Sequence, residues 1–138
     1  ILLQPDSVFQ VLGPRLAGKR REEFYVLPLD VRGRLLGPLS PARSGAANSV
    51  IVRPGEAFRE AIVQDAVSIV LVHNHPSGDP RPSPQDVAVT KGLIEAGALL
   101  DIEVLDHVVI GHGAYVSMRR EGLAFGPEPP AKGRGRSR

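Results

Sequence analysis

A run of β-branched and apolar residues lies in the middle of the chain, where residues 67–72 read VSIVLV. A short run of β-branched and apolar residues is typical of a strand buried on both faces in the centre of a sheet. Residues 22–30, EEFYVLPLD, also predict a strand, because apolar side chains fall on both of its faces. One face would carry Phe24, Val26 and Pro28, and the other Tyr25, Leu27 and Leu29.

Turn-forming residues follow this second strand, since DVRGR at residues 30–34 is typical of a turn. Residues 35–40, LLGPLS, are then expected to return as the other strand of a hairpin. Residues 44–52 predict a loop that leads into a short extended piece. Two more strands are expected at residues 102–111 and 114–118, joined by a Gly-His-Gly turn.

A short amphipathic helix is expected near the start of the chain, within residues 7–16. Asp6 or Ser7 can cap its first turn. Gly13 and Pro14 are expected to break or end it, because proline removes a backbone donor inside a helix.

Two longer helices are predicted further along. The first begins near Pro54 within residues 53–66 and has acidic residues in its first turn. The second runs from about Pro84 to Leu99. Their apolar positions are Ala57, Phe58, Ala61 and Ile62 in the first helix, and Val87, Val89, Ile94, Ala98 and Leu99 in the second.

The order of these elements after the first helix, β-β-α-β-α-β-β, contains no internal repeat. It predicts an α/β or α+β fold in which helices flank a mixed β-sheet. At 138 residues the chain has room for one hydrophobic core. We therefore expect one domain over residues 1–126, followed by a tail at residues 127–138.

Charge distinguishes this tail from the domain. Residues 127–138 carry a net charge of +3 within a whole-chain charge of +2, which leaves residues 1–126 at −1. The tail is rich in Pro, Gly and Arg and is expected to be disordered. It can serve as a solubilising end, or it can contact DNA phosphates weakly and without sequence preference.

Further features narrow the class of protein. The chain has no cysteine, which excludes a disulfide framework and a thiolate metal site and favours a reducing compartment, the cytoplasm. No apolar run approaches the roughly 18 residues that a membrane-spanning helix needs. The chain opens without an initiator Met or a signal peptide, so we expect it to be a fragment of a longer protein whose preceding segment is missing here.

Two histidines stand one residue apart where the predicted central strand ends. His73 and His75 would point to one side of the strand and Asn74 to the other. Four prolines and a glycine stiffen the stretch 76–84, and Asp86 follows in the first turn of the next helix. Two imidazoles and a carboxylate are therefore expected to meet at one place.

This set of side chains suits Zn²⁺, and three protein ligands with one open position indicate a catalytic site rather than a structural one. A zinc-activated water could then act as a nucleophile if a base takes its proton. The alternative is purely structural. Ser83 and Asp86 also fit an ordinary helix start, and two histidines can belong to a hydrogen-bonded loop. The histidine pair and the Ser83–Asp86 segment, occurring together at this spacing, favour the metal site.

Residues 73–86, HNHPSGDPRPSPQD, resemble the metal-binding signature of the JAMM (MPN+) metalloproteases, His-x-His-Pro followed after six residues by Ser-x-x-Asp. Asn74 with PSGDP, and the segments REEFYVLPLD, SGAANSVIVRPGEAF, LLDIEVLDHVVIG and AYVSM, are similar to one branch, the bacterial RadC-like proteins. The resemblance covers about residues 1–125. It implies the JAMM/MPN fold, which is of the cytidine deaminase-like class.

The resemblance also implies roles for particular residues. His73, His75 and Asp86 would bind the zinc ion, and Ser83 would steady the oxyanion of a tetrahedral intermediate. The register of the family's Glu-x-Phe places its general base at Glu22.

Three further assignments concern residues near these positions or in the following strands. Glu23 would point to the opposite face of the strand from Glu22, where we expect a solvated surface charge. His107 is interpreted as a buried structural histidine, with a role behind the metal ligands as the alternative. His112, between two glycines, is expected in an exposed turn.

The sequence therefore predicts a zinc metallohydrolase of JAMM type, a metallopeptidase or isopeptidase acting on a peptide or protein whose identity the sequence does not disclose. The alternative is a DNA-repair-associated nucleic-acid-binding factor or nuclease in which the zinc domain is a scaffold. Aromatic residues make up only 4% of the chain, too few for evident base-stacking surfaces.

Overall fold

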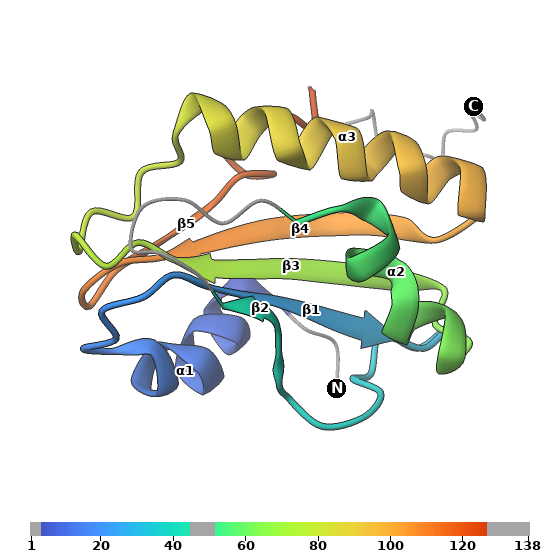
Figure 1. Cartoon of the computed structure of the whole chain (residues 1–138), viewed down its shortest axis with the longest axis horizontal. Helices are drawn as coiled ribbons and strands as arrows, with labels where there is room; N and C mark the ends of the chain where they lie inside the picture. The colour runs from blue at the N-terminus through green and yellow to red at the C-terminus, as the bar shows by residue number, and fades with distance from the viewer. Residues whose placement is uncertain (1–3, 45–51, 127–138) are drawn as a thin grey trace.

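A computed structural model describes residues 4–44 and 52–126. Within these residues one five-stranded mixed sheet has the strand order β2-β1-β3-β4-β5, and three helices cover it (Figure 1). The strands are β1 Glu23–Leu29, β2 Pro41–Ser44, β3 Ser68–Asn74, β4 Glu103–Ile110 and β5 Tyr115–Ser117. The helices are α1 Pro5–Leu16, α2 Pro54–Val63 and α3 Pro84–Leu100. The predicted α/β class with helices against a mixed sheet is confirmed.

The central strand is β3, and every one of its residues is buried. It pairs antiparallel with β1, where Phe24 lies opposite His73, and parallel with β4, where Val109 lies opposite His73. Helices α2 and α3 cover one face of the sheet and α1 covers the other (Figure 1). This burial on both faces explains the run of β-branched and apolar residues in β3.

The side chains of β1 alternate between the two faces of the sheet, as predicted, but they pack with two hydrophobic clusters where one core was expected. Phe24 and Val26 pack with the core under α2 and α3. Tyr25, Leu27 and Leu29 pack with the core around α1. Because successive side chains point to opposite faces, one strand supplies both cores.

The expected second strand at residues 35–40 is wrong in position. The edge strand that pairs antiparallel with β1 is β2, and in the expected stretch an isolated bridge joins Leu35 to Leu29. Gly37 adopts a φ of 75°, which bends the chain away from β1. Pro38 lacks a backbone donor, so pairing resumes only after the bend.

Helix α1 begins earlier than expected, and the expected break at Gly13 and Pro14 is wrong. Pro5 occupies its first position and Gln4 precedes it, so neither Asp6 nor Ser7 is the cap. The helix also continues through Pro14 to its end at Leu16. The buried side chains of α1, which lie on both sides of this proline, offset the lost hydrogen bond. They are Val8, Leu12 and Leu16.

Helices α2 and α3 lie where the sequence predicts them, but each buries a narrower face than expected. Ile62 is 54% exposed and Leu99 is 89% exposed, although both were expected to pack. The buried residues of α3 are Thr90, Leu93 and Gly97. The expected apolar positions cover more of the helix surface than the sheet can bury, and only packing selects among them.

Several expectations lie outside the described residues. They are the loop over residues 45–51 and the disordered tail at residues 127–138. Within the part of the chain that the structure describes, none of the helices combines the length and apolar character needed to cross a bilayer.

Candidate metal centre

Three segments meet where β3 ends. His73 belongs to β3 and His75 follows the last residue of that strand. Glu22 directly precedes β1, next to Phe24 and its partner His73. Asp86 lies in the first turn of α3, to which the proline-rich loop returns the chain. The sheet register and the start of one helix therefore bring these side chains together.

The two imidazoles share the carboxylate of Asp86. Its Oδ1 lies 3.2 Å from Nε2 of His73, and its Oδ2 lies 3.0 Å from Nε2 of His75. Glu22 joins the same cluster, because one ligand atom from each of Glu22, His73 and His75 lies within 4.8 Å of the other two. The structure thus gathers two imidazoles and two carboxylates, a donor set that could hold a metal ion.

The Nε2 atom of His73 is a buried polar atom without a hydrogen-bond partner among the described residues. Asp86 Oδ1 is close to it, but the ring is not aligned for a hydrogen bond. A small cavity of about 30 Å³ lies here, large enough for an ion or a water molecule. An unpartnered imidazole nitrogen beside such a space fits a metal ligand. The lining residues are Glu22, Phe24, His73, Ser83, Gln85, Asp86, Val89 and His107.

The start of α3 explains how the Asp86 carboxylate is held. Asp86 N–H donates to Ser83 Oγ over 3.0 Å, and Ser83 N–H donates to Asp86 Oδ2 over 2.7 Å. This capping box is the structural alternative considered for the sequence, and it coexists with the histidine contacts. The same hydrogen bonds that start the helix orient the carboxylate toward His73 and His75.

Electrostatics keeps Asp86 ionised. Burial alone would raise the pKa of Asp86, but its contacts with His73 and His75 outweigh this and hold the pKa well below its usual range. Burial alone would lower the pKa of His75, but the Asp86 carboxylate and the Asp79 carbonyl raise it above its ordinary value. In the metal-free protein this pair therefore favours a charged carboxylate beside a readily protonated imidazole.

His75 also contacts the backbone of its own loop. Its Nδ1 lies 2.9 Å from the carbonyl oxygen of Asp79. A carbonyl can only accept, so Nδ1 carries a proton, and in the neutral ring Nε2 is left with its lone pair. Nε2 is the atom that faces Asp86, and its 3.0 Å hydrogen bond to Oδ2 requires a proton on Nε2, because an ionised carboxylate only accepts. Loss of that proton leaves the lone pair of Nε2 directed at the place where a metal ion would bind.

The loop that connects β3 to α3 is held against the turn between β4 and β5. The N–H of His112 donates to Gly78 O over 2.9 Å. Gly78 has a φ of 97°, and a Cβ on Gly111 would lie 2.2 Å from Gly78 O, so both positions require glycine. His112 itself is exposed, as expected. Close backbone contact therefore fixes the loop that carries His75.

Of the two adjacent glutamates, Glu22 reaches the cluster and is only 7% exposed. Glu23 is not the solvated charge that was expected. Its carboxylate accepts a hydrogen bond from the Tyr25 hydroxyl at 3.2 Å and pairs with Lys19 at 3.5 Å. The pKa of Tyr25 is raised, first by burial and then by the charge of Glu23.

Asn74 holds the backbone on both sides of Glu22. Its Oδ1 accepts from Glu23 N–H over 2.7 Å, and its Nδ2 donates to Arg21 O over 3.1 Å. A side chain that points away from His73 and His75 therefore fixes the position of the neighbouring glutamate.

Behind His73 lies a second buried histidine, which favours the alternative considered for His107. His107 Nε2 is 2.8 Å from His73 Nδ1, and His107 Nδ1 is 2.6 Å from Thr90 Oγ1. Burial holds the pKa of His107 well below its ordinary value. Sequence reasoning missed Thr90. Its spacing of four residues from Asp86 on one helix was the available signal.

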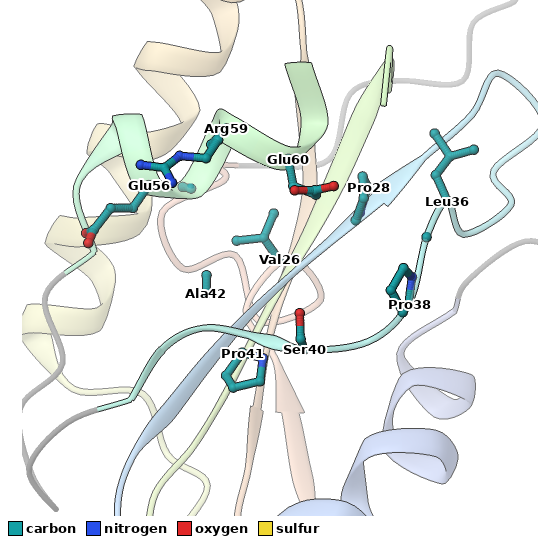
Figure 2. A pocket seen from close by; sticks show the side chains of 12 residues that line it. Val26, Pro28, Leu36, Pro38, Ser40, Pro41, Ala42, Glu56, Arg59 and Glu60 are labelled. Carbon is teal, nitrogen blue, oxygen red and sulfur yellow. The ribbon is translucent and has the colours of Figure 1, made fainter. Parts of the chain in front are cut away.

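A different pocket, of about 410 Å³, lies between α2 and the edge formed by β1 and β2. Figure 2 shows Glu56, Arg59 and Glu60 of α2 lying over Val26 of β1 and Ala42 of β2. None of the clustered histidines and carboxylates lines it. The chemistry that the sequence predicts is therefore concentrated at the end of β3, not in this larger space.

The chain is similar to known proteins over most of its length. A family model described as the RadC-like JAB domain matches residues 2–123. A UPF0758 protein from Roseiflexus castenholzii is 47% identical over 121 residues, which cover 88% of this chain and 52% of that protein. A UPF0758 protein from Methanosarcina acetivorans is 41% identical over 122 residues, which cover 88% of this chain and 53% of that protein. The chain thus spans about half the length of the curated relatives it matches.

Proposed function

Because the chain belongs to the RadC-like JAB domain family, we propose that it is a zinc-dependent metallohydrolase, and more narrowly a metallopeptidase or isopeptidase of JAMM type. The observation that carries the proposal is the meeting of His73, His75, Asp86 and Glu22 around the unpartnered Nε2 of His73. Two imidazole nitrogens and two carboxylates match the ligand and base set of a catalytic zinc site.

In this proposal His73, His75 and Asp86 hold the ion. Asp86 and His75 are oriented by the capping box and by the Asp79 carbonyl, so little rearrangement is needed to bind it. A zinc ion supplies Lewis acidity, which makes a water molecule acidic near neutral pH and polarises a substrate carbonyl.

Glu22 acts as the general base. Its carboxylate belongs to the same cluster as the imidazoles and lines the same small cavity. It takes the proton of the attacking water and later donates it to the leaving amine. Ser83 also lines the cavity. Its hydroxyl group donates a hydrogen bond to the oxyanion that forms when the amide carbonyl is attacked.

The experiment that tests this function is the substitution Glu22→Gln. Glutamine keeps the size of the side chain but cannot accept the proton, so turnover of a cleavable amide should fall by roughly 10² to 10⁴. The zinc content should stay that of the wild type. Glu23→Gln is the matched control, because Glu23 contacts Lys19 and Tyr25 and should leave turnover unchanged. Hydrolysis by Glu22→Gln at the wild-type rate would refute the assigned role.

Metal analysis tests the ligand set independently. The purified wild-type chain should contain stoichiometric zinc, and His75→Ala and Asp86→Ala should not. A wild-type chain that binds no zinc under saturating conditions would exclude the proposed function altogether.

The alternative from the sequence is a DNA-repair-associated nucleic-acid-binding factor or nuclease in which the zinc domain is a scaffold. The basic residues 127–138, which can contact DNA weakly by charge alone, lie outside the described residues. This alternative stays a prediction. DNA binding that survives deletion of residues 127–138 and keeps a steep salt dependence would favour it.

A further inference from the structure

A chain of hydrogen bonds runs behind the proposed zinc ligands. His73 Nδ1 lies 2.8 Å from His107 Nε2, and His107 Nδ1 lies 2.6 Å from Thr90 Oγ1. Thr90 Oγ1 in turn lies 2.7 Å from the carbonyl oxygen of Asp86. The side chains of this relay, His73, His107 and Thr90, are all buried. The relay therefore joins one proposed ligand to the backbone of another.

The direction of the relay follows from its last member. A carbonyl oxygen can only accept, so the single hydroxyl proton of Thr90 is donated to Asp86 O. Thr90 Oγ1 must then accept from His107 Nδ1, which carries a proton. His107 is buried, and its two ring contacts, Thr90 Oγ1 and His73 Nδ1, do not belong to carboxylates. A second proton on this ring would therefore be a buried charge without a hydrogen-bonded counter-charge, which is costly.

A neutral His107 has one proton and one lone pair. Since Nδ1 holds the proton, Nε2 offers the lone pair and accepts from His73 Nδ1. A neutral His73 then has its lone pair on Nε2. That atom lies 3.2 Å from Asp86 Oδ1 but makes no hydrogen bond with it or with any other described residue, and it borders the small cavity.

We propose that Thr90 and His107 are positioning residues that hold His73 in the tautomer with its proton on Nδ1 and its lone pair on Nε2, directed at the site where a metal ion would bind. This inference rests on the proposed function, because it assigns the relay a purpose in zinc binding. The opposite tautomer would present an N–H to the cation and could not ligate it.

The fold explains why His73 needs a relay of side chains. His75 lies beyond the strand and uses a nearby backbone carbonyl, that of Asp79. His73 lies within β3, whose backbone pairs with β1 on one side and β4 on the other. The backbone carbonyls around His73 are engaged in the sheet. The acceptor for His73 Nδ1 is therefore a side chain, His107 on β4, which Thr90 on α3 holds in place.

Packing also restrains the two rings. Phe24 stacks on His73 with ring centroids 5.8 Å apart and an interplanar angle of 12°. The edge contact between Phe24 and His107 has a centroid separation of 5.4 Å. A ring held on its face by Phe24 and at Nδ1 by His107 has a fixed orientation as well as a fixed tautomer.

The tautomer can be measured without metal. We would record ¹⁵N–¹H correlation spectra of the histidine side chains in the metal-free 138-residue chain at about pH 8.5, roughly two units above the ordinary histidine pKa. His73 should show a protonated Nδ1 and an unprotonated Nε2, and His107 should show the same. A proton on Nε2 of His73 would overturn the inference, because the relay would then run in the opposite direction.

The effect on metal binding is tested with Zn²⁺ alone in competition with a chromophoric chelator. Thr90→Val keeps the shape of the side chain but removes the hydroxyl, and should weaken zinc binding about 10- to 100-fold. Thr90→Ser keeps the hydroxyl and should restore near wild-type affinity. His107→Gln offers an amide oxygen to His73 Nδ1 and should lie between wild type and Thr90→Val, which keeps the test informative if one variant folds poorly.

Leu93→Val is the matched control, since Leu93 is buried on α3 one turn beyond Thr90 but belongs to the apolar core. It should lower the melting temperature without changing zinc affinity. Equal losses of affinity in Thr90→Val and Leu93→Val, or no loss in Thr90→Val, would overturn the inference. A wild-type chain that binds neither Zn²⁺ nor Co²⁺ would refute the proposed function, while the spectra would still decide the tautomer.

Discussion

Asn74 stands between the two histidines of the site in sequence, yet it acts on Glu22. Its amide group bonds to the peptide groups of Arg21 and Glu23 and so brackets the glutamate from both sides. Asn74 is 3% exposed, which makes these hydrogen bonds stronger than equivalent bonds on the surface. The position of Glu22 depends on these anchored peptide groups. A general base must lie within hydrogen-bond reach of the proton that it removes.

Replacing Asn74 by Ala should therefore separate base positioning from metal binding. Without the amide, the segment before β1 loses both anchors. A displacement of about 1 Å at a catalytic group can lower turnover about 100-fold. We expect kcat to fall by about that factor, with zinc affinity within about twofold of wild type. Steady-state kinetics and chelator competition measure the two quantities, and a parallel loss of both would contradict this role.

Helix α3 is the element that carries Asp86 and Thr90, so its distance from the sheet matters. The C-terminal end of α3 packs closely against the residue that precedes β4, since a Cβ on Gly97 would lie 2.3 Å from Ile102 O. That neighbour is backbone and cannot move aside cheaply. Gly92 lies in the same helix, and a Cβ there would meet no atom within 4 Å. One glycine therefore permits close packing, and the other only lowers helix propensity.

The two glycines predict opposite effects of one substitution. Gly97→Ala should lower the free energy of unfolding by about 1–3 kcal/mol, because the added methyl group overpacks the contact with Ile102. Gly92→Ala should raise it by about 0.5–1 kcal/mol through helix propensity. Urea unfolding of both variants measures the difference. A Gly97→Ala protein as stable as Gly92→Ala would contradict the close approach of α3.

At the scale of the whole molecule, the clustered side chains join segments that lie far apart in the chain. Glu22 precedes β1, His73 and His75 end β3, and Asp86 begins α3. An ion held there connects the central strand to a helix that covers one face of the sheet. Because the unfolded chain cannot offer the same arrangement, binding should stabilise the folded state.

Zinc should therefore raise the melting temperature of the wild-type chain. At a free concentration of about 100 times Kd, the gain is about 2.7 kcal/mol, which corresponds to roughly 10 °C for a domain of this size. A chelator should reverse the shift, and Asp86→Ala should show none. Differential scanning calorimetry with and without zinc measures it, and an equal shift in Asp86→Ala would place the ion elsewhere.

The size of this shift should depend on pH through His75. The pKa of His75 is raised above 6.5 in the metal-free protein, so its protonation stabilises that form fully below pH 6.5, and this stabilisation is lost as the pH rises through the folded-state pKa. Zinc requires the neutral ring and competes with this proton. The zinc-dependent shift should be largest above the folded-state pKa of His75 and decline as the pH falls. A shift that stays constant from about pH 8 to pH 5.5 would contradict this competition.

Features with a local physical cause were the ones that the sequence determined. The apolar run of β3, the two-sided pattern of β1 and the capped start of α3 each depend on periodicity or on hydrogen bonds between near neighbours. The proximity of His73, His75 and Asp86 follows from the same local rules, because a strand end and a stiff loop confine all three.

The tertiary structure decided what depends on contacts between distant segments. Burial of α1 outweighs the break that Pro14 predicts, and the bend at Gly37 moves the edge strand to β2. His107 and Thr90 meet His73 only because β4 pairs with β3 and α3 packs above them. Such contacts depend on the register of the strands and on the packing of helices against the sheet. The energy for both comes from contacts between residues that are distant in the sequence, so no local pattern predicts them.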